Sequence, residues 1–475
     1  MLSGLLPLTA SGTSLSALER RVMALEQELA EARADLAAAQ RGAADRPALG
    51  LSADLDAEPD RGAGPLTAPL AEPAAGPIAA APAAVAPPPP ADKIRIGPLT
   101  IGGAMRVNYV LGAYPGGGDG PSRGGHGGNF ELDTFRINAD LQVEQLVGAL
   151  EYRWYDGYNF IHTGWLGWDF VDGSQVQVGV NRVPFGPGPY GVSQSWFFDQ
   201  HYYLGLADDL QLGVKYSTGF GDLALDLAYY NRSVWDGRGR SRDSARYSYA
   251  PVIWTSGLDV DGNVVAAAPN GYQRRHQFNL RAIQSFPDWP VVTALGASVQ
   301  YGQLQGRRAR DGDHWAASLH MTNTWNNWLL ATQVTRFAHR IHADNALGTA
   351  TLLPMGAYDF AWPVAAKGWL PAVSLSYLWE TDAIPWLDSV RPYLEYSTIL
   401  KDEGDFKNSA LLIAGAAWAR GNWFIYSDLA WSDGNYFVGN RGDDYSNIFS
   451  GVGDFGVNGN DRWNYRFNIN FGYYF

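Results

Sequence analysis

Cysteine is absent from this chain of 475 residues, and so is any run of about 18 consecutive apolar residues. The first absence excludes disulfides and thiolate metal sites, and the second excludes a transmembrane helix. The net charge of −13 argues against nucleic-acid binding. Neither a Gly-x-Ser-x-Gly nucleophile motif nor a phosphate-binding loop is present. We therefore expect a protein that is not an enzyme and that has no cofactor or metal site.

The last thirteen residues, Trp463 to Phe475, alternate almost without error. Aromatic and apolar side chains take the odd positions, while Asn464, Arg466 and Asn468 are among the even ones. A period of two places the two sets on opposite faces of one strand. A transmembrane barrel needs such a strand, although a soluble antiparallel sheet can show the same pattern. The ending on Phe475 resembles the C-terminal signal strand of Gram-negative outer-membrane proteins, which the barrel-assembly machinery reads.

Similar alternation recurs in about sixteen segments from Leu99 onward, and short turns alternate with long polar loops. The long loops lie near 112–129, 184–208, 232–272, 339–367 and 433–461. Outer-membrane barrels have short periplasmic turns and long external loops. This asymmetry favours an all-β transmembrane barrel of about 16 antiparallel strands over residues 94–475.

Aromatic side chains gather at the ends of the predicted strands, as in the two girdles of a membrane barrel. We expect one girdle at the short turns, formed by Trp289, Trp325, Trp328, Trp386 and Trp423. The other is expected at the opposite strand ends, formed by Trp154, Tyr229, Tyr301, Trp379 and Trp431.

The first 93 residues differ in composition from the rest. Residues 1–14 have a short apolar stretch without a basic region, which indicates a tail or the remnant of a signal peptide. Residues 15–40 carry a heptad pattern with charged flanks, which predicts an N-terminal α-helical coiled coil. Residues 41–93 are rich in Ala and Pro, so we expect an extended linker. An even strand number would leave this coiled coil in the periplasm.

The stretch from Val178 to Gly186 (VGVNRVPFG) resembles the strand-end motif of the phosphate-selective (O/P-type) porins of Gram-negative outer membranes. In that superfamily the motif leads into the third external loop, and some trimeric relatives carry an N-terminal coiled coil and pass small dicarboxylates. The resemblance implies a sixteen-stranded homotrimeric channel whose third loop folds inward. Phosphate-type members also carry a cluster of lysines at the constriction, whereas Lys215 is the one clear lumen-facing lysine here.

In a pore, function depends on charge and size at the narrowest section. Extending each strand's alternation predicts the following cationic pore-lining side chains: Arg106, Arg136, Arg153, Arg182, Lys215, Arg281, Arg391 and Arg466. Counter-charges are predicted at Asp140, Glu144, Glu151, Asp226 and Glu395. An arginine can either lower the barrier for an anion or pair with a carboxylate to brace the wall, and both interpretations stay open.

These features predict a porin in the cell outer membrane, a passive diffusion channel for small hydrophilic solutes with a mild preference for small anions such as phosphate and dicarboxylates. Two other functions remain open: a structural envelope tether anchored by the barrel, and a barrel-rim hydrolase. The expected partners are two further copies of the chain, outer-membrane lipid and lipopolysaccharide, and peptidoglycan at the coiled coil. The basic run from Arg238 to Arg246 can meet lipopolysaccharide phosphates or attract anions.

Overall fold

The structure, a computed structural model, describes residues 94–112, 128–239, 241–258, 264–381, 383–435, 437–438, 455–458 and 462–475. The predicted tail, coiled coil and linker at residues 1–14, 15–40 and 41–93 lie outside the described residues. Within the part of the chain that is described, no helix is long and apolar enough to cross a membrane.

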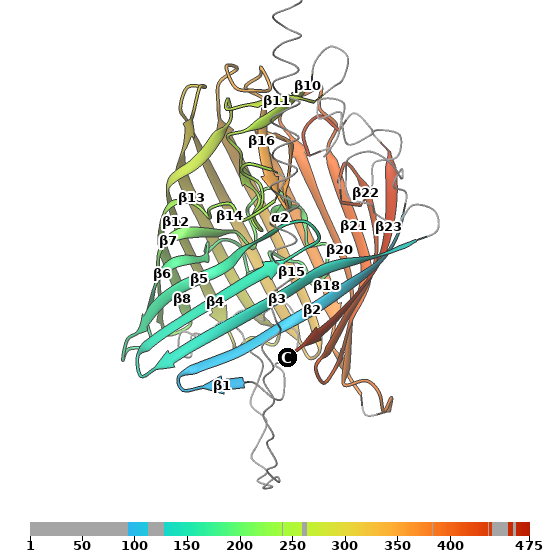
Figure 1. Cartoon of the computed structure of the whole chain (residues 1–475). Coiled ribbons are helices and arrows are strands. Elements are labelled where there is room, and N and C mark those ends of the chain that lie inside the picture. The colour runs from blue at the N-terminus through green and yellow to red at the C-terminus, as the bar shows by residue number, and fades with distance from the viewer. Residues whose placement is uncertain are drawn as a thin grey trace, which may run out of the picture. The chain divides into compact units, whose positions relative to one another are not determined.

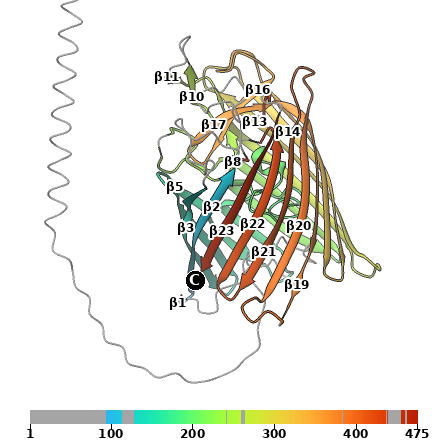
Figure 2. The ribbon, with the colours of Figure 1, turned by 90° about the vertical axis from the view of Figure 1, so that its right-hand side faces the viewer.

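Most strands of the described residues belong to one antiparallel sheet of eighteen strands. Two of these, β1 (Ile94–Ile96) and β19 (Trp379–Glu380), are short segments, and the other sixteen are long. The long strands are β2 (Leu99–Gly112), β3 (Asn129–Val143), β4 (Leu146–Trp154), β5 (Asn159–Asp169), β6 (Gln175–Arg182), β7 (Leu210–Phe220), β8 (Leu223–Ser233), β12 (Tyr272–Phe286), β13 (Val292–Gly306), β14 (Gly312–Trp325), β15 (Trp328–Arg340), β18 (Lys367–Tyr377), β20 (Ser389–Lys401), β21 (Ser409–Arg420), β22 (Trp423–Asp433) and β23 (Trp463–Tyr474). β23 pairs with β2, so the sheet closes into a barrel (Figures 1 and 2). The predicted sixteen-stranded barrel is confirmed.

The terminal strand β23 has the two faces that its alternation predicts. The odd positions Trp463, Tyr465, Phe471 and Tyr473 are exposed on the outside, and the even positions from Asn464 to Asn470 are buried on the inside. The outer face is apolar and the inner face is polar because each strand alternates with a period of two. The same arrangement in the other strands gives the barrel an apolar outer wall and a polar lumen.

The connections at the two ends of the barrel differ in length as predicted. The turns at the end that holds β1 and the C-terminus include 144–145, 221–222, 326–327 and 421–422. The long connections lie at the opposite end: 113–128, 183–209 (loop 3), 234–271 (loop 4), 341–366 (loop 6) and 434–462 (loop 8). Loops 4 and 6 contribute a small sheet of β9 (Ala250–Pro251), β16 (Leu352–Ala357) and β17 (Phe360–Ala365), and loop 4 also holds β10 (Thr255–Leu258) and β11 (Val264–Ala268).

The predicted aromatic girdles are present with one correction. Trp289, Trp325, Trp328, Trp386 and Trp423 are exposed near the short turns, and Tyr301 is exposed near the long-loop end. Trp379 was expected near the long loops, but it lies in β19 and pairs with Val390 at the start of β20. It therefore belongs to the short-turn end, because β18 runs from Lys367 at the long-loop end downward and β19 follows it directly.

Candidate permeation site

Loop 3 begins where β6 cannot continue. Pro184 has no amide hydrogen to donate to a neighbouring strand, and Gly186 has a positive φ of 79°. The chain therefore leaves the sheet after Arg182 and turns into the lumen. Gly186 N donates a hydrogen bond to Ser298 Oγ of β13 (3.1 Å), and most of the loop's side chains are buried.

The middle of loop 3 is held by two buried carboxylates on the far side of the barrel. Glu395 of β20 accepts hydrogen bonds from Ser193 Oγ (2.7 Å) and from the backbone N–H of Gln194 (2.5 Å). Asp428 of β22 accepts one from the backbone N–H of Trp196 (3.2 Å). Both carboxylates are almost fully buried. Loop 3 starts between β6 and β7. Because β20 and β22 lie on the opposite side of the barrel from β6 and β7, the loop crosses the lumen.

A single-turn helix, α2 (Gln200–Tyr203), fixes the rest of the loop. Asp199 caps its N-terminus and also accepts a hydrogen bond from the amide of Val192 (2.9 Å). Gln200 N donates to Ser397 Oγ (3.1 Å), and His201 Nε2 lies 2.8 Å from Thr335 Oγ1. The loop thus contacts β13, β15, β20 and β22, which narrows the lumen at its own level. The inward fold that the resemblance implied for this loop is observed.

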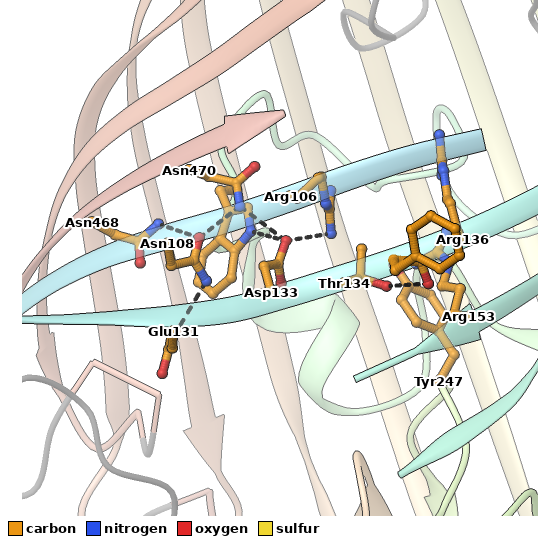
Figure 3. A network of polar contacts seen from close by, with 12 residues as sticks. Arg106, Asn108, Glu131, Asp133, Thr134, Arg136, Arg153, Tyr247, Asn468 and Asn470 are labelled. Atoms are coloured by element: carbon orange, nitrogen blue, oxygen red, sulfur yellow. Dashed lines mark hydrogen bonds and ion pairs between the residues drawn. The ribbon is translucent and has the colours of Figure 1, made fainter. Parts of the chain in front are cut away.

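Arg106 and Arg466, two predicted pore-lining residues, belong to a polar network around β2 and β3. Figure 3 shows the part of this network around Arg106 and Asp133. Arg106 pairs with Asp133 (2.7 Å), which also accepts a hydrogen bond from Asn470 Nδ2 (2.9 Å). Arg466 is fully buried, donates to the backbone oxygen of Phe437 (2.9 Å) and lies 3.4 Å from Glu131. Its guanidinium also lies over the rings of Trp196 and Phe197 of loop 3. Arg466 therefore braces loop 3 against β23.

Arg136 and Arg153 share one carboxylate. Their guanidinium groups lie 3.3 Å and 2.5 Å from the oxygens of Glu151 on β4. Arg153 also lies 4.5 Å above the ring centre of Tyr247 from loop 4, and Figure 3 shows the two side chains together with Arg136. Two cations face one carboxylate here, so this part of the wall carries an excess of positive charge.

A similar arrangement lies at the start of loop 3. Arg182 pairs with Asp208 (2.8 Å), whose other oxygen accepts a hydrogen bond from Tyr247 Oη (2.6 Å). Lys215 Nζ donates to the backbone oxygen of Arg182 (3.3 Å). Burial and the neighbouring Asp208 raise the pKa of Tyr247 well above its usual value, so this hydroxyl stays neutral and donates.

The remaining predicted residues occupy four different settings. Arg281 pairs with Asp226 (2.8 Å), and Asp140 is half-buried on the inner face of β3. Arg391 lies on the inner face of β20, and no carboxylate of the described residues is within ion-pair distance of it. Glu144 lies in the β3–β4 turn with a positive φ of 51° and an exposed side chain. Glu144 is therefore not one of the inward-facing residues, which corrects the prediction. Glu395 does face inward, but it accepts hydrogen bonds from loop 3 and does not pair with an arginine.

Side-chain exposure separates the cations that reach the open lumen from those that are packed. The side chains of Arg106, Arg136, Arg182 and Arg281 are 16–23% exposed, whereas that of Arg466 is 0% exposed. The four exposed arginines can meet a passing solute without rearrangement, whereas Arg466 cannot. In the described part of the chain, no group of three or more His, Cys, Asp or Glu residues could hold a metal ion.

Sequence reasoning missed Asp133, Asp208 and Asp428. Asp133 is the extra residue of a β-bulge opposite Arg106 and Val107, and the bulge turns both Asp133 and Thr134 inward. Strict alternation assigns one of these two positions to the outer face. Asp208 lies in loop 3, where no periodicity exists. Asp428 does lie on the predicted inner face of β22, and its alternation was a signal that could have found it.

No protein-family model matches the chain, and no curated protein matches it. Among solved structures, the chain is similar to OmpT, an outer membrane protein of Vibrio cholerae in its trimer form (13% identity, TM-score 0.46, 79% of this chain and 99% of that chain covered). It is also similar to the outer membrane channel DcaP of Acinetobacter baumannii (10%, 0.49, 79% and 97%) and to the anion-selective porin from Comamonas acidovorans (12%, 0.48, 79% and 99%).

Proposed function

We propose that this protein is an outer-membrane porin, a passive diffusion channel for small hydrophilic solutes. One observation carries the proposal: a closed barrel of sixteen long strands has an apolar outer wall and a charged inner wall, with loop 3 folded across the lumen. An apolar outer wall between two aromatic girdles matches a lipid bilayer. A polar inner wall supports water and solutes.

A mild preference for small anions follows from the balance of charge on one wall. Arg136 and Arg153 share the single carboxylate of Glu151, so two cations stand against one carboxylate on this part of the wall. Arg391 adds a further positive charge from β20. The arginine fork binds carboxylate and phosphate oxygens well. Small phosphate-like or dicarboxylate anions therefore suit this wall, although most of its arginines are also paired and brace the barrel.

Liposome swelling tests the channel. Liposomes that contain the purified protein should swell in iso-osmotic solutions of small sugars and should not swell with oligosaccharides too large for the lumen. Absence of swelling with every solute would contradict the proposal. For the anion preference, Arg391→Gln should move the reversal potential in a salt gradient toward cations, and Arg420→Gln, at the exposed end of β21 beside a short turn, should leave it unchanged.

We further propose a homotrimer whose N-terminal coiled coil lies in the periplasm on the Ala/Pro-rich linker and contacts peptidoglycan. The support is the heptad pattern of residues 15–40 and the position of β1 at the short-turn end. Deletion of residues 1–92 tests both roles. Loss of trimers in native mass spectrometry would assign the coil to assembly, and intact trimers with a weakened envelope would assign it to tethering.

A further inference from the structure

Loop 6 contributes a β-hairpin at the opening of the barrel on the long-loop side, where Figure 1 shows β16 above α2. Its strands β16 and β17 pair over their whole length, and two residues, Tyr358 and Asp359, join them. β16 has six residues, and a strand of this length extends about 20 Å. The hairpin starts between β15 and β18, the eleventh and twelfth of the sixteen long strands, whereas β4 and β5 are the third and fourth. It therefore starts on the side of the barrel opposite to β4 and β5.

The tip of the hairpin contacts the wall on that opposite side. The β4–β5 connection (155–158) presents the stacked rings of Tyr155 and Tyr158, whose centroids lie 5.0 Å apart. The ring of Tyr358 meets that of Tyr155 edge-on, with 5.6 Å between the centroids. Its hydroxyl forms a hydrogen bond with the hydroxyl of Tyr202 in α2. A side chain from loop 6 thus touches both the opposite wall and loop 3, so the hairpin crosses the lumen.

Both residues at the tip have a backbone conformation that side chains disfavour. The φ values are 51° at Tyr358 and 65° at Asp359. A two-residue hairpin turn with positive φ at both positions usually takes Asn-Gly. Loop 4 holds this turn in place, because Tyr358 N–H donates to the backbone oxygen of Arg246 (2.8 Å) and Asp359 N–H donates to that of Ser244 (2.8 Å). Strain that the surroundings maintain at a defined place is a reason to ask what the tip does.

The body of the hairpin is also packed against its neighbours. All residues of β16 are buried, and Trp362 of β17 is 1% exposed. β16 pairs with β9 of loop 4 on one edge. On the other edge, Ala365 N–H donates to the backbone oxygen of Phe455 in loop 8 (2.9 Å). Neighbouring loops therefore support both edges, and the hairpin is a fixed part of the opening.

We infer that the β16–β17 hairpin sets the upper size limit for solutes that enter from the long-loop side, and that the ring of Tyr358 holds it in position. A solute from this side meets the hairpin before loop 3. A solute from the short-turn side reaches loop 3 without passing the hairpin. The inference rests on the proposed function, because it assumes a conducting barrel, and it adds a second selective section to the channel.

Polymer exclusion from each side of a planar bilayer tests this inference. Polyethylene glycols of increasing mass are added to one side only, and the smallest mass that no longer lowers the conductance is the cut-off for that side. Since the chain has no cysteine, Asp222→Cys at an exposed short turn accepts an impermeant maleimide and reports which side the turns face. The cut-off should be lower from the long-loop side than from the short-turn side.

Two variants remove the hairpin or its anchor. Replacement of residues 354–363 by an Asn-Gly turn keeps the first two residue pairs of the hairpin. It should raise the cut-off from the long-loop side by at least about twofold in mass, because polymer size grows only as about the square root of chain length. Tyr358→Ala should raise the same cut-off by a smaller step, and Tyr358→Phe, which keeps the ring, is the matched control. The cut-off from the short-turn side should stay the same in all three.

The outcomes separate this inference from the channel proposal. Conductance with equal cut-offs from both sides, or a long-loop cut-off that the shortened variant leaves unchanged, would overturn the inference and leave the channel intact. Absence of conductance in the unmodified chain would contradict the channel and this inference with it. An unchanged cut-off in Tyr358→Ala would refute anchoring by its ring. That result decides the inference alone if heat-modified electrophoretic mobility shows that the shortened variant forms no barrel.

Discussion

Glu395 is the residue whose removal should change the lumen most. In the folded barrel this buried carboxylate receives one hydrogen bond from the side chain of Ser193 and one from the backbone of Gln194, both in loop 3. Ser374 of β18 supplies a third (3.0 Å) and so fixes the carboxylate itself. Glu395→Ala removes all three and leaves the donors of loop 3 without their acceptor.

The size of the effect follows from the two bonds to the loop. A hydrogen bond contributes about 0.5–1.5 kcal/mol net, and about 1.5–3 kcal/mol where one group is charged. Two bonds therefore contribute at least about 1 kcal/mol to the attached position of loop 3. Since about 1.4 kcal/mol is a factor of ten, the ratio of attached to detached loop should fall by at least about fivefold. Glu395→Gln keeps one carbonyl acceptor and should lie between the two.

Single-channel recording measures the loop directly. Glu395→Ala should show larger conductance with frequent brief fluctuations, and polymers that the unmodified channel excludes should begin to reduce its current. Ser376→Ala is the matched control, because Ser376 is a buried serine on the same face of β18 whose hydroxyl has no hydrogen-bond partner. Unchanged conductance and noise in Glu395→Ala would refute the claim that this carboxylate holds the loop.

Three further changes test the wall and the start of loop 3. Glu151→Gln should make the channel more anion-selective in reversal-potential measurements, because Arg136 and Arg153 lose the carboxylate they share; a shift toward cations would contradict this. Arg106→Gln should lower the free energy of unfolding by about 2–4 kcal/mol in urea titrations, because it leaves Asp133 buried beside fewer donors. Adding Asp133→Asn should restore part of that loss. Strictly additive effects of the two substitutions on the free energy of unfolding would exclude coupling between Arg106 and Asp133. Gly186→Ala should displace loop 3 and raise conductance, since the new Cβ would lie 3.0 Å from Gln333 at a φ of 79°, whereas Gly221→Ala, at a positive φ with open space around it, should not.

The architecture could be predicted from the sequence because its signals are local. Each strand carries its own alternation, and the contrast between turns such as 421–422 and loops such as 234–271 is visible without knowing which strands pair. These local signals predicted the number of strands, the face of β23 that points inward, and the difference between the two ends of the barrel in the length of their connections. Trp379 was assigned to the wrong end, because β18 starts at loop 6 and runs toward the short turns, which carries Trp379 to that end.

The candidate site could be predicted only in part, because its partners are distant in sequence. The inward position of Arg106 followed from alternation, but its partner Asp133 depends on a bulge that alternation does not show. Glu395 was expected to balance an arginine, and its actual donors come from a loop about 200 residues earlier. The alternation of β3 was extended one residue too far, because the strand ends at Val143 and Glu144 lies in the turn. The alternation therefore predicts the correct face for a charged side chain within a regular strand, but not at a bulge or in a turn.

The central claim is a water-filled channel with a preference for small anions. Its most direct measurement is the reversal potential of the purified protein in a planar bilayer across a tenfold gradient of potassium chloride. The account predicts stable conductance steps and a reversal potential whose sign corresponds to greater permeability for chloride than for potassium. A bilayer that stays silent would contradict the channel, and a potential of the opposite sign would contradict the anion preference.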